Sequence, residues 1–231
     1  MISRLAAGLI LGVAIGIAVL HLEAAPQQTE KDYDINTALM KATFKIEGRT
    51  AQGQPTIGTA FVMGRPSAHP LGDQPQKFRI VLITAAHVLN EMQGDQAILH
   101  LRRRVSTDNW VRIPFPIRIR ASGQAIWKKH PDADVAVMYI DLPRDVPIEQ
   151  FSTDMLADDK IMEKYEVHPG DELKCLGYPF GLESNDAGFP VLRSGKIASY
   201  PLLPTASTRT FLFDFRVFKG NSGGPVYIEE A

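Results

Sequence analysis

Lys219 to Tyr227 reads Lys-Gly-Asn-Ser-Gly-Gly-Pro-Val-Tyr, and this stretch decides the fold because a serine among glycines is well placed to act as a nucleophile. Gly220, Gly223 and Gly224 remove side chains around Ser222, so the backbone can turn tightly and a substrate carbonyl can approach. The same turn can aim the amides of Gly220 and Ser222 at one point, as an oxyanion hole requires. Taken alone, the pattern is equally typical of a flexible turn.

A base for this serine is predicted upstream. Residues 79–90 form an apolar β-type run that ends in small residues and then His87. Further on, Asp134 directly precedes a second apolar strand. A carboxylate there can accept the imidazole Nδ1–H, fix the tautomer and stabilise the imidazolium. Asp132 is the rival carboxylate, although only Asp134 stands directly before the strand, and His130 is interpreted as a loop residue.

The three candidates follow the chain order His87, Asp134, Ser222, which differs from the order in α/β-hydrolases and in subtilisins. Each alone has an ordinary interpretation, as a packed histidine, a turn aspartate and a turn serine. Together, Thr-Ala-Ala-His, Asp-Val-Ala-Val and Gly-Asn-Ser-Gly-Gly-Pro resemble the triad motifs of trypsin-like serine peptidases. The bacterial HtrA-like branch is the most similar, since Pro-Gly-Asp at 169–171 and Gly-Tyr-Pro-Phe-Gly-Leu at 177–182 resemble its blocks.

This resemblance runs from about residue 58 to residue 227 and implies an all-β fold. Two antiparallel β-barrels, the trypsin-like or chymotrypsin fold, would hold the catalytic groups in the cleft between them. We expect a first barrel over residues 42–141 with His87 and Asp134, an acidic connector over 142–168, and a second barrel over 169–231 with Ser222. A helical turn or two is expected around residues 155–164. Strands are expected at 42–47, 58–63, 78–84, 97–102, 110–119, 135–140, 172–177, 191–199, 211–215 and 225–228.

The resemblance also implies a serine endopeptidase that acts on peptide or protein substrates and needs no cofactor or metal. Ser222 would attack the carbonyl, His87 would act as general base and then general acid, and Asp134 would orient His87. The amides of Gly220 and Ser222 would hold the oxyanion. Two alternatives stay open: a non-catalytic peptide-binding module on the same fold, and an esterase-type serine hydrolase with the same nucleophile.

Substrate preference is predicted from the residues just before the serine. Arg216 lies six residues before Ser222, where trypsins carry the aspartate at the base of the primary pocket. The resemblance therefore implies that Arg216 is a substrate-binding residue that disfavours Lys and Arg substrates. Alternatively, Asp214 aligns with the HtrA-like Thr-Asp-Ala element and Arg216 faces solvent. Asn221 stands where zymogen-type trypsins carry the aspartate that pairs with a new amino terminus, so that activation route is not expected.

Composition excludes several kinds of site. The formal net charge is −1, from 25 Lys and Arg against 26 Asp and Glu, so no global field draws the chain to nucleic acid. The dense basic run of residues 102–104 is interpreted as a solvated strand end. The six histidines lack ligand spacing, which argues against a metal site. Cys175 is the sole cysteine, so no internal disulfide can form, and we interpret it as a small buried hydrophobe.

The first 41 residues and the residues after Ser222 lead to separate predictions about export and about the second barrel. Residues 1–25 contain Arg4 followed by an apolar stretch, which predicts a signal peptide or an N-terminal membrane anchor. The chain is thus expected to be exported, whether periplasmic, extracellular or anchored with its catalytic region outside the cytoplasm. Residues 26–41 are expected to be a linker. Only nine residues follow Ser222, so we expect a fragment whose second barrel is truncated and whose activity is weak.

Overall fold

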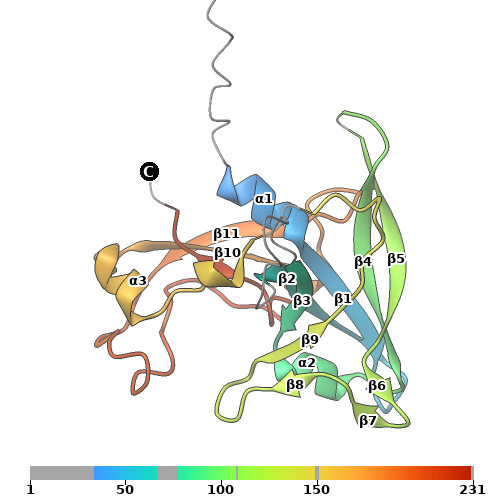
Figure 1. Ribbon diagram of the computed structural model, residues 1–231, viewed down its shortest axis with the longest axis horizontal. Coiled ribbons are helices and arrows are strands. Elements are labelled where there is room, and N and C mark those ends of the chain that lie inside the picture. The colour runs from blue at the N-terminus through green and yellow to red at the C-terminus, as the bar shows by residue number, and fades with distance from the viewer. Residues whose placement is uncertain (1–33, 67–77, 108, 149–150, 230–231) are drawn as a thin grey trace, which may run out of the picture. The chain divides into compact units, whose positions relative to one another are not determined.

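The computed structural model describes residues 34–66, 78–107, 109–148 and 151–229, and within them the chain folds mainly into antiparallel sheets (Figure 1). The largest sheet has seven strands in the order β5-β4-β1-β2-β3-β9-β8. A second sheet has the order β11-β10-β12, and β6 pairs with β7. The strands are β1 Thr43–Arg49, β2 Pro55–Pro66, β3 Phe78–Thr84, β4 Gln96–Arg104, β5 Trp110–Arg118, β6 Arg120–Ala121, β7 Gln124–Ala125, β8 Lys128–Lys129, β9 Ala136–Tyr139, β10 Glu172–Gly177, β11 Val191–Lys196 and β12 Val226–Tyr227.

The predicted mostly-β fold of antiparallel strands is confirmed, and β3 and β10 have the predicted bounds. The pairings of the main sheet end at β5 and β8, so its closure into a barrel stays a prediction. The strand predicted at 211–215 is wrong: Phe213 makes an isolated bridge with Ile197. Beside this bridge the Ala198 amide donates to the Leu212 carbonyl at 2.7 Å and the Asp214 amide donates to the Lys196 carbonyl at 2.8 Å. Farther along, the Arg216 carbonyl accepts a hydrogen bond from the Arg193 side chain.

The main core joins buried residues of the seven-stranded sheet with buried residues of two helices, α1 (Ile35–Ala42) and α2 (Ala86–Glu91). The Asp34 side chain caps α1 by accepting hydrogen bonds from the amides of the second and third helical residues. Ala38, Leu39 and Ala42 of this helix are buried. The predicted linker over 26–41 is therefore wrong for residues 35–41, where an aspartate cap and an apolar face make a helix.

A smaller core supports the three-stranded sheet. Its buried members are Met162, Leu173, Ile197 and Leu202. Met162 comes from α3 (Asp159–Lys164), which follows the single turn η1 (Thr153–Met155). The Asp158 carboxylate caps α3 by accepting a hydrogen bond from the Ile161 amide at 2.9 Å. The helical turns expected around residues 155–164 are thus confirmed.

Cys175 lies in β10 and is buried, as the sequence predicts. Burial raises the pKa of its thiol, although the nearby Arg193 charge acts in the opposite direction. A thiol that stays protonated is a poor nucleophile, so Cys175 serves here as a small core residue.

The prediction that residues 102–104 form a solvated basic run is wrong for Arg102, whose side chain is almost fully buried at 2% exposure. Its guanidinium donates to the carbonyls of Met40, Thr43 and Gly188 and to the Tyr178 hydroxyl, at 2.7–3.2 Å. The rings of Phe44 and Phe189 lie on it, at 4.6 and 4.5 Å. Burial lowers the Arg102 pKa. This side chain therefore ties the end of α1 and the start of β1 to Tyr178 at the end of β10.

We predict that Arg102→Met lowers the free energy of unfolding by roughly 3 kcal/mol, since several buried carbonyls lose their donor at once. Urea unfolding followed by tryptophan fluorescence measures this. Arg103→Met is the matched control, because Arg103 is exposed and pairs with Asp145 at 2.6 Å. Its loss should be below about 1 kcal/mol. Equal urea midpoints for the two variants would contradict the assignment of Arg102 as a structural tie.

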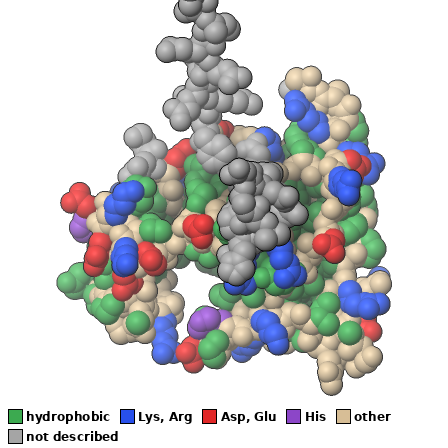
Figure 2. Space-filling model, viewed as in Figure 1, with side chains coloured by type: hydrophobic (Ala, Val, Ile, Leu, Met, Phe, Trp, Pro, Cys, Tyr) green, Lys and Arg blue, Asp and Glu red, His purple; other side chains and the backbone are tan. Residues whose placement is uncertain are grey.

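Residues 1–25, the predicted signal peptide or anchor, lie outside the described residues. None of the helices in the described ranges is both long and apolar enough to cross a bilayer. On the face shown in Figure 2, basic and acidic side chains are interspersed, in keeping with the net charge of −1.

Candidate active site

His87 lies on α2, which begins directly after β3. The helix buries Ala86, Val88 and Leu89 in the main core, so the histidine faces the other way. Its side chain is 46% exposed. The strand and the buried helix face thus hold the backbone in place, while the imidazole stays reachable from solvent.

The Asp134 carboxylate holds His87 at two points. Its Oδ1 accepts a hydrogen bond from the His87 backbone amide at 2.9 Å, and its Oδ2 pairs with the ring Nδ1. The first contact caps α2, whose own N-cap residue, Ala85, has no side-chain oxygen. The second fixes the ring and leaves Nε2 as the nitrogen available to another group.

The pKa of Asp134 lies below the usual carboxyl value even though burial raises it. Hydrogen bonds from the His87 ring and amide lower it by more, and the charges of His87 and Lys129 add to this effect. Asp134 is therefore ionised at neutral pH. A carboxylate in this position can stabilise an imidazolium on His87.

The structure distinguishes Asp134 from Asp132, the other carboxylate considered as the partner of His87. The Asp132 carboxylate pairs with Arg209 Nη1 at 3.1 Å and does not contact His87. His130 lies in the preceding turn, where its Nδ1 accepts hydrogen bonds from the amides of Asp132 and Ala133 at 3.1 and 3.0 Å. The interpretation of His130 as a loop residue is confirmed.

The serine loop, residues 219–224, packs against the end of β3 that leads to His87. A Cβ built on Gly223 would lie 2.3 Å from the Thr59 carbonyl oxygen and 2.3 Å from Thr84 Oγ1. The φ of Gly223 is +88°, in the region that favours glycine. Glycine is therefore required at this position both by its backbone conformation and by its close contact with Thr59 and Thr84. Thr84 is three residues before His87, so the loop and the histidine lie in the same part of the molecule.

Ser222 itself is half-buried, and its hydroxyl forms no hydrogen bond with any residue of the described ranges, His87 included. The structure thus brings His87 and Asp134 into contact and places Ser222 near them without a bond to the imidazole.

The two amides predicted for the oxyanion hole have no hydrogen-bond acceptor in the part of the chain that the structure describes. Neither Gly220 nor Ser222 donates its N–H to an atom of the described residues. The φ of Gly220 is +97°, and a Cβ on it would lie 2.1 Å from the Tyr178 carbonyl oxygen. The loop is therefore held tightly from one side while these donors stay available.

Arg216, predicted to bind substrate, is exposed, and its side chain makes no bond or ion pair with the described residues. Its carbonyl accepts from the guanidinium of Arg193, which lies on β11. Asp214, the alternative residue, is also exposed. The structure does not bring Arg216 to the His87–Asp134 pair, and its role in substrate binding stays a prediction.

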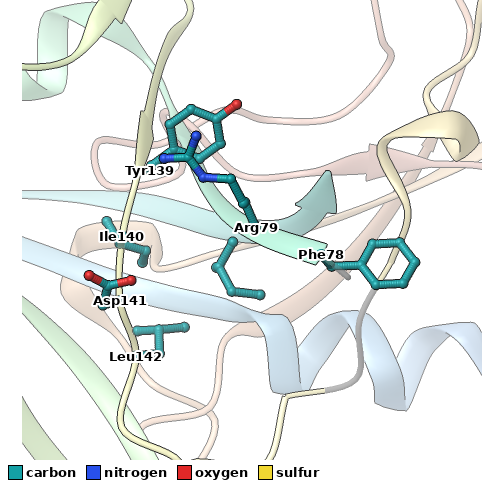
Figure 3. A pocket seen from close by; sticks show the side chains of 7 residues that line it. Phe78, Arg79, Tyr139, Ile140, Asp141 and Leu142 are labelled. Carbon is teal, nitrogen blue, oxygen red and sulfur yellow. The ribbon is translucent and has the colours of Figure 1, made fainter. Parts of the chain in front are cut away.

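A cavity of about 330 Å³ lies elsewhere, between the start of β3 and the end of β9. In Figure 3 the Arg79 guanidinium lies against the Tyr139 ring, 3.6 Å from its centroid. The strand register pairs Val81 with Tyr139 and Thr84 with Ala136, so this cavity is at the opposite end of the ladder from His87. The residues that line it are Phe78, Arg79, Ile80, Tyr139, Ile140, Asp141 and Leu142.

Sequence reasoning missed Thr59, whose backbone and side chain both bond to the serine loop. The available signal was the tripeptide Gly58-Thr59-Ala60, which puts small residues in a strand where another backbone approaches. Within the described ranges, no three His, Cys, Asp or Glu side chains are grouped so that they could hold a metal ion.

A model of the trypsin-like peptidase domain family matches residues 58–230. Among solved structures, the MamO protease domain from Magnetospirillum magneticum (apo form) is 18% identical, over 83% of this chain and 80% of that one, with a TM-score of 0.46. The protease Anisep from Arthrobacter nicotinovorans is 16% identical over 84% and 80%, with a TM-score of 0.43. The Rv3671c protease from M. tuberculosis (active form) is 16% identical over 98% and 78%, with a TM-score of 0.44. The search of curated proteins gives no match.

Proposed function

Because the chain belongs to the trypsin-like peptidase domain family, we propose that it is a serine endopeptidase that cleaves peptide bonds through an acyl-enzyme. Ser222 is the nucleophile, His87 the base and Asp134 the carboxylate that orients the base. The observation that carries this proposal is the two-point contact of Asp134 with His87, through the ring and the amide of the same residue. A carboxylate that merely capped α2 would need only the amide.

In the acylation step, Ser222 Oγ attacks the peptide carbonyl carbon while His87 Nε2 takes the hydroxyl proton. The tetrahedral intermediate then expels the amine, to which His87 returns the proton. Asp134 stays ionised throughout and stabilises the imidazolium, in agreement with its lowered pKa. The new bond joins Ser222 Oγ to the acyl carbon, and the bond that breaks is the C–N bond of the substrate.

In the deacylation step, water takes the place of the amine. His87 removes a proton from the water, the hydroxide attacks the acyl carbon, and Ser222 leaves as a hydroxyl after His87 returns the proton. In both steps negative charge develops on the former carbonyl oxygen. The amides of Gly220 and Ser222, which donate to none of the described residues, are the donors proposed to stabilise it.

We predict that the chain cleaves internal bonds of casein or of a mixed peptide library and that a fluorophosphonate labels Ser222. Mass spectrometry of the products and of the labelled protein reads out both results. A binding module on the same fold would bind peptides without cleavage and without labelling. An esterase would be labelled and would hydrolyse activated esters, but the peptide library would stay intact.

A further inference from the structure

Thr59 is a fully buried residue of β2 that contacts the serine loop at two carbonyls. Its backbone amide donates to the Ser222 carbonyl at 2.9 Å, and its hydroxyl donates to the Gly220 carbonyl at 2.7 Å. The same hydroxyl accepts a hydrogen bond from the Tyr178 amide at 3.2 Å. The Thr59 carbonyl accepts from Thr84 Oγ1 at 2.7 Å. Every polar group of Thr59 is therefore paired.

Two further carbonyls of the loop also accept hydrogen bonds. The Lys219 carbonyl accepts from the Phe180 amide at 2.7 Å, and the Asn221 carbonyl accepts from an amide within the loop at 3.1 Å. A peptide unit is planar and trans, so its N–H points away from its C=O. Holding the Lys219 carbonyl therefore orients the Gly220 N–H, and holding the Asn221 carbonyl orients the Ser222 N–H.

Four consecutive carbonyls, from residue 219 to residue 222, thus accept hydrogen bonds, three of them from residues outside the loop, while the amides of Gly220 and Ser222 donate to no described residue. Glycine at 220 and 223 gives this backbone wide conformational freedom, so the loop depends on outside contacts for its shape. Thr59 supplies two of these contacts, and its hydroxyl is the side-chain donor among them.

We propose that Thr59 is a positioning residue, whose hydroxyl holds the serine loop in the shape that the reaction uses. This inference rests on the proposed function and adds a residue to it. The hydrogen bond from Thr84 extends the same network to within three residues of His87. Thr59 therefore fixes the serine loop against the strand that leads to the base.

The test compares Thr59→Val, which keeps the shape and loses the hydroxyl, with Thr59→Ser, which keeps the hydroxyl. We expect Thr59→Val to lower kcat by about tenfold to hundredfold with little change in KM, since a small displacement of catalytic groups is costly. Thr59→Ser should retain most of kcat. Thr56→Val is the matched control, because Thr56 is also buried on β2 but its hydroxyl bonds to Glu91 at 3.1 Å.

A second measurement is independent of activity: deuterium uptake by peptides that cover residues 216–226. Uptake should be faster in Thr59→Val than in the wild type, Thr59→Ser or Thr56→Val. If uptake is equal in all four proteins, or if the Val and Ser variants at Thr59 share one kcat, the proposal is overturned. An equal kcat loss in Thr56→Val also overturns it. A wild-type protein without hydrolysis or labelling would refute the proposed function, and uptake would still decide whether Thr59 holds the loop.

Discussion

Replacement of Ser222 by alanine is expected to lower kcat/KM for peptide hydrolysis by roughly 10⁴- to 10⁶-fold and to abolish fluorophosphonate labelling. The hydroxyl is the atom to which the acyl group is transferred, so the acyl-enzyme cannot form without it. The residual rate would come from substrate binding and from the amides of Gly220 and Ser222. Steady-state kinetics on a peptide found in the digest, together with intact-protein mass spectrometry after labelling, measures both effects.

The same substitution should leave the fold intact, which separates loss of chemistry from loss of structure. The Ser222 hydroxyl bonds to no described residue, and the backbone carbonyl keeps its hydrogen bond from Thr59. The free energy of unfolding should therefore change by less than about 0.5 kcal/mol. Ser194→Ala, at an exposed position of β11, is the control and should be labelled and active like the wild type. Labelling of Ser222→Ala at the wild-type rate would identify another nucleophile.

The parts of the fold that the sequence predicts well are those with a strong local pattern. The apolar run of β3 and the alternating residues of β10 have the predicted bounds, because the pattern and the sheet environment agree there. At 211–215 the local pattern also favours a strand. In the described structure, however, this segment makes a single bridge, between Ile197 and Phe213, and the Arg216 carbonyl just beyond it accepts a hydrogen bond from the Arg193 side chain.

Contacts between residues far apart in the sequence also differ in how well the sequence predicts them. The pairing of His87 with Asp134 is predictable because each stands at a recognisable strand end within a known chain order. Arg102 and Thr59 are not predictable by such a rule. The burial of Arg102 depends on carbonyls from the end of α1 and from Gly188, and the role of Thr59 depends on a loop more than 150 residues away in the sequence. The sequence around Arg102 and around Thr59 does not predict the hydrogen-bond partners of either residue.

Asp134→Asn is expected to lower kcat by roughly 10⁴-fold, the size of effect seen in the template serine protease triad. The asparagine oxygen can still accept the His87 amide and cap α2. Its NH₂ group would then face Nδ1 and donate to it, which places the ring proton on Nε2. An Nε2 that already carries a proton cannot accept one from Ser222. The asparagine thus has nearly the same shape as Asp134 but stabilises the tautomer of His87 that cannot act as the base.

The matched control is Asp132→Asn, two residues earlier in the same turn. Asp132 pairs with Arg209 in an exposed ion pair, so its loss should leave kcat unchanged. If both substitutions reduce kcat to the same degree, the turn as a whole, and not the carboxylate on His87, is responsible.

The Asp134 carboxylate also predicts how stability depends on pH. Its folded-state pKa lies below 3.8, mainly because the His87 hydrogen bonds outweigh the opposing effect of burial. A depressed carboxyl pKa contributes stability that is present above the unfolded-state pKa and is lost as the pH falls through the folded-state pKa. Wild type should thus be more stable than Asp134→Asn at pH 7, and urea midpoints should converge as the pH falls below about 4. A difference that stayed constant from pH 7 to pH 3 would show that the charge of Asp134 contributes nothing to the fold, and that its contact with His87 serves orientation alone.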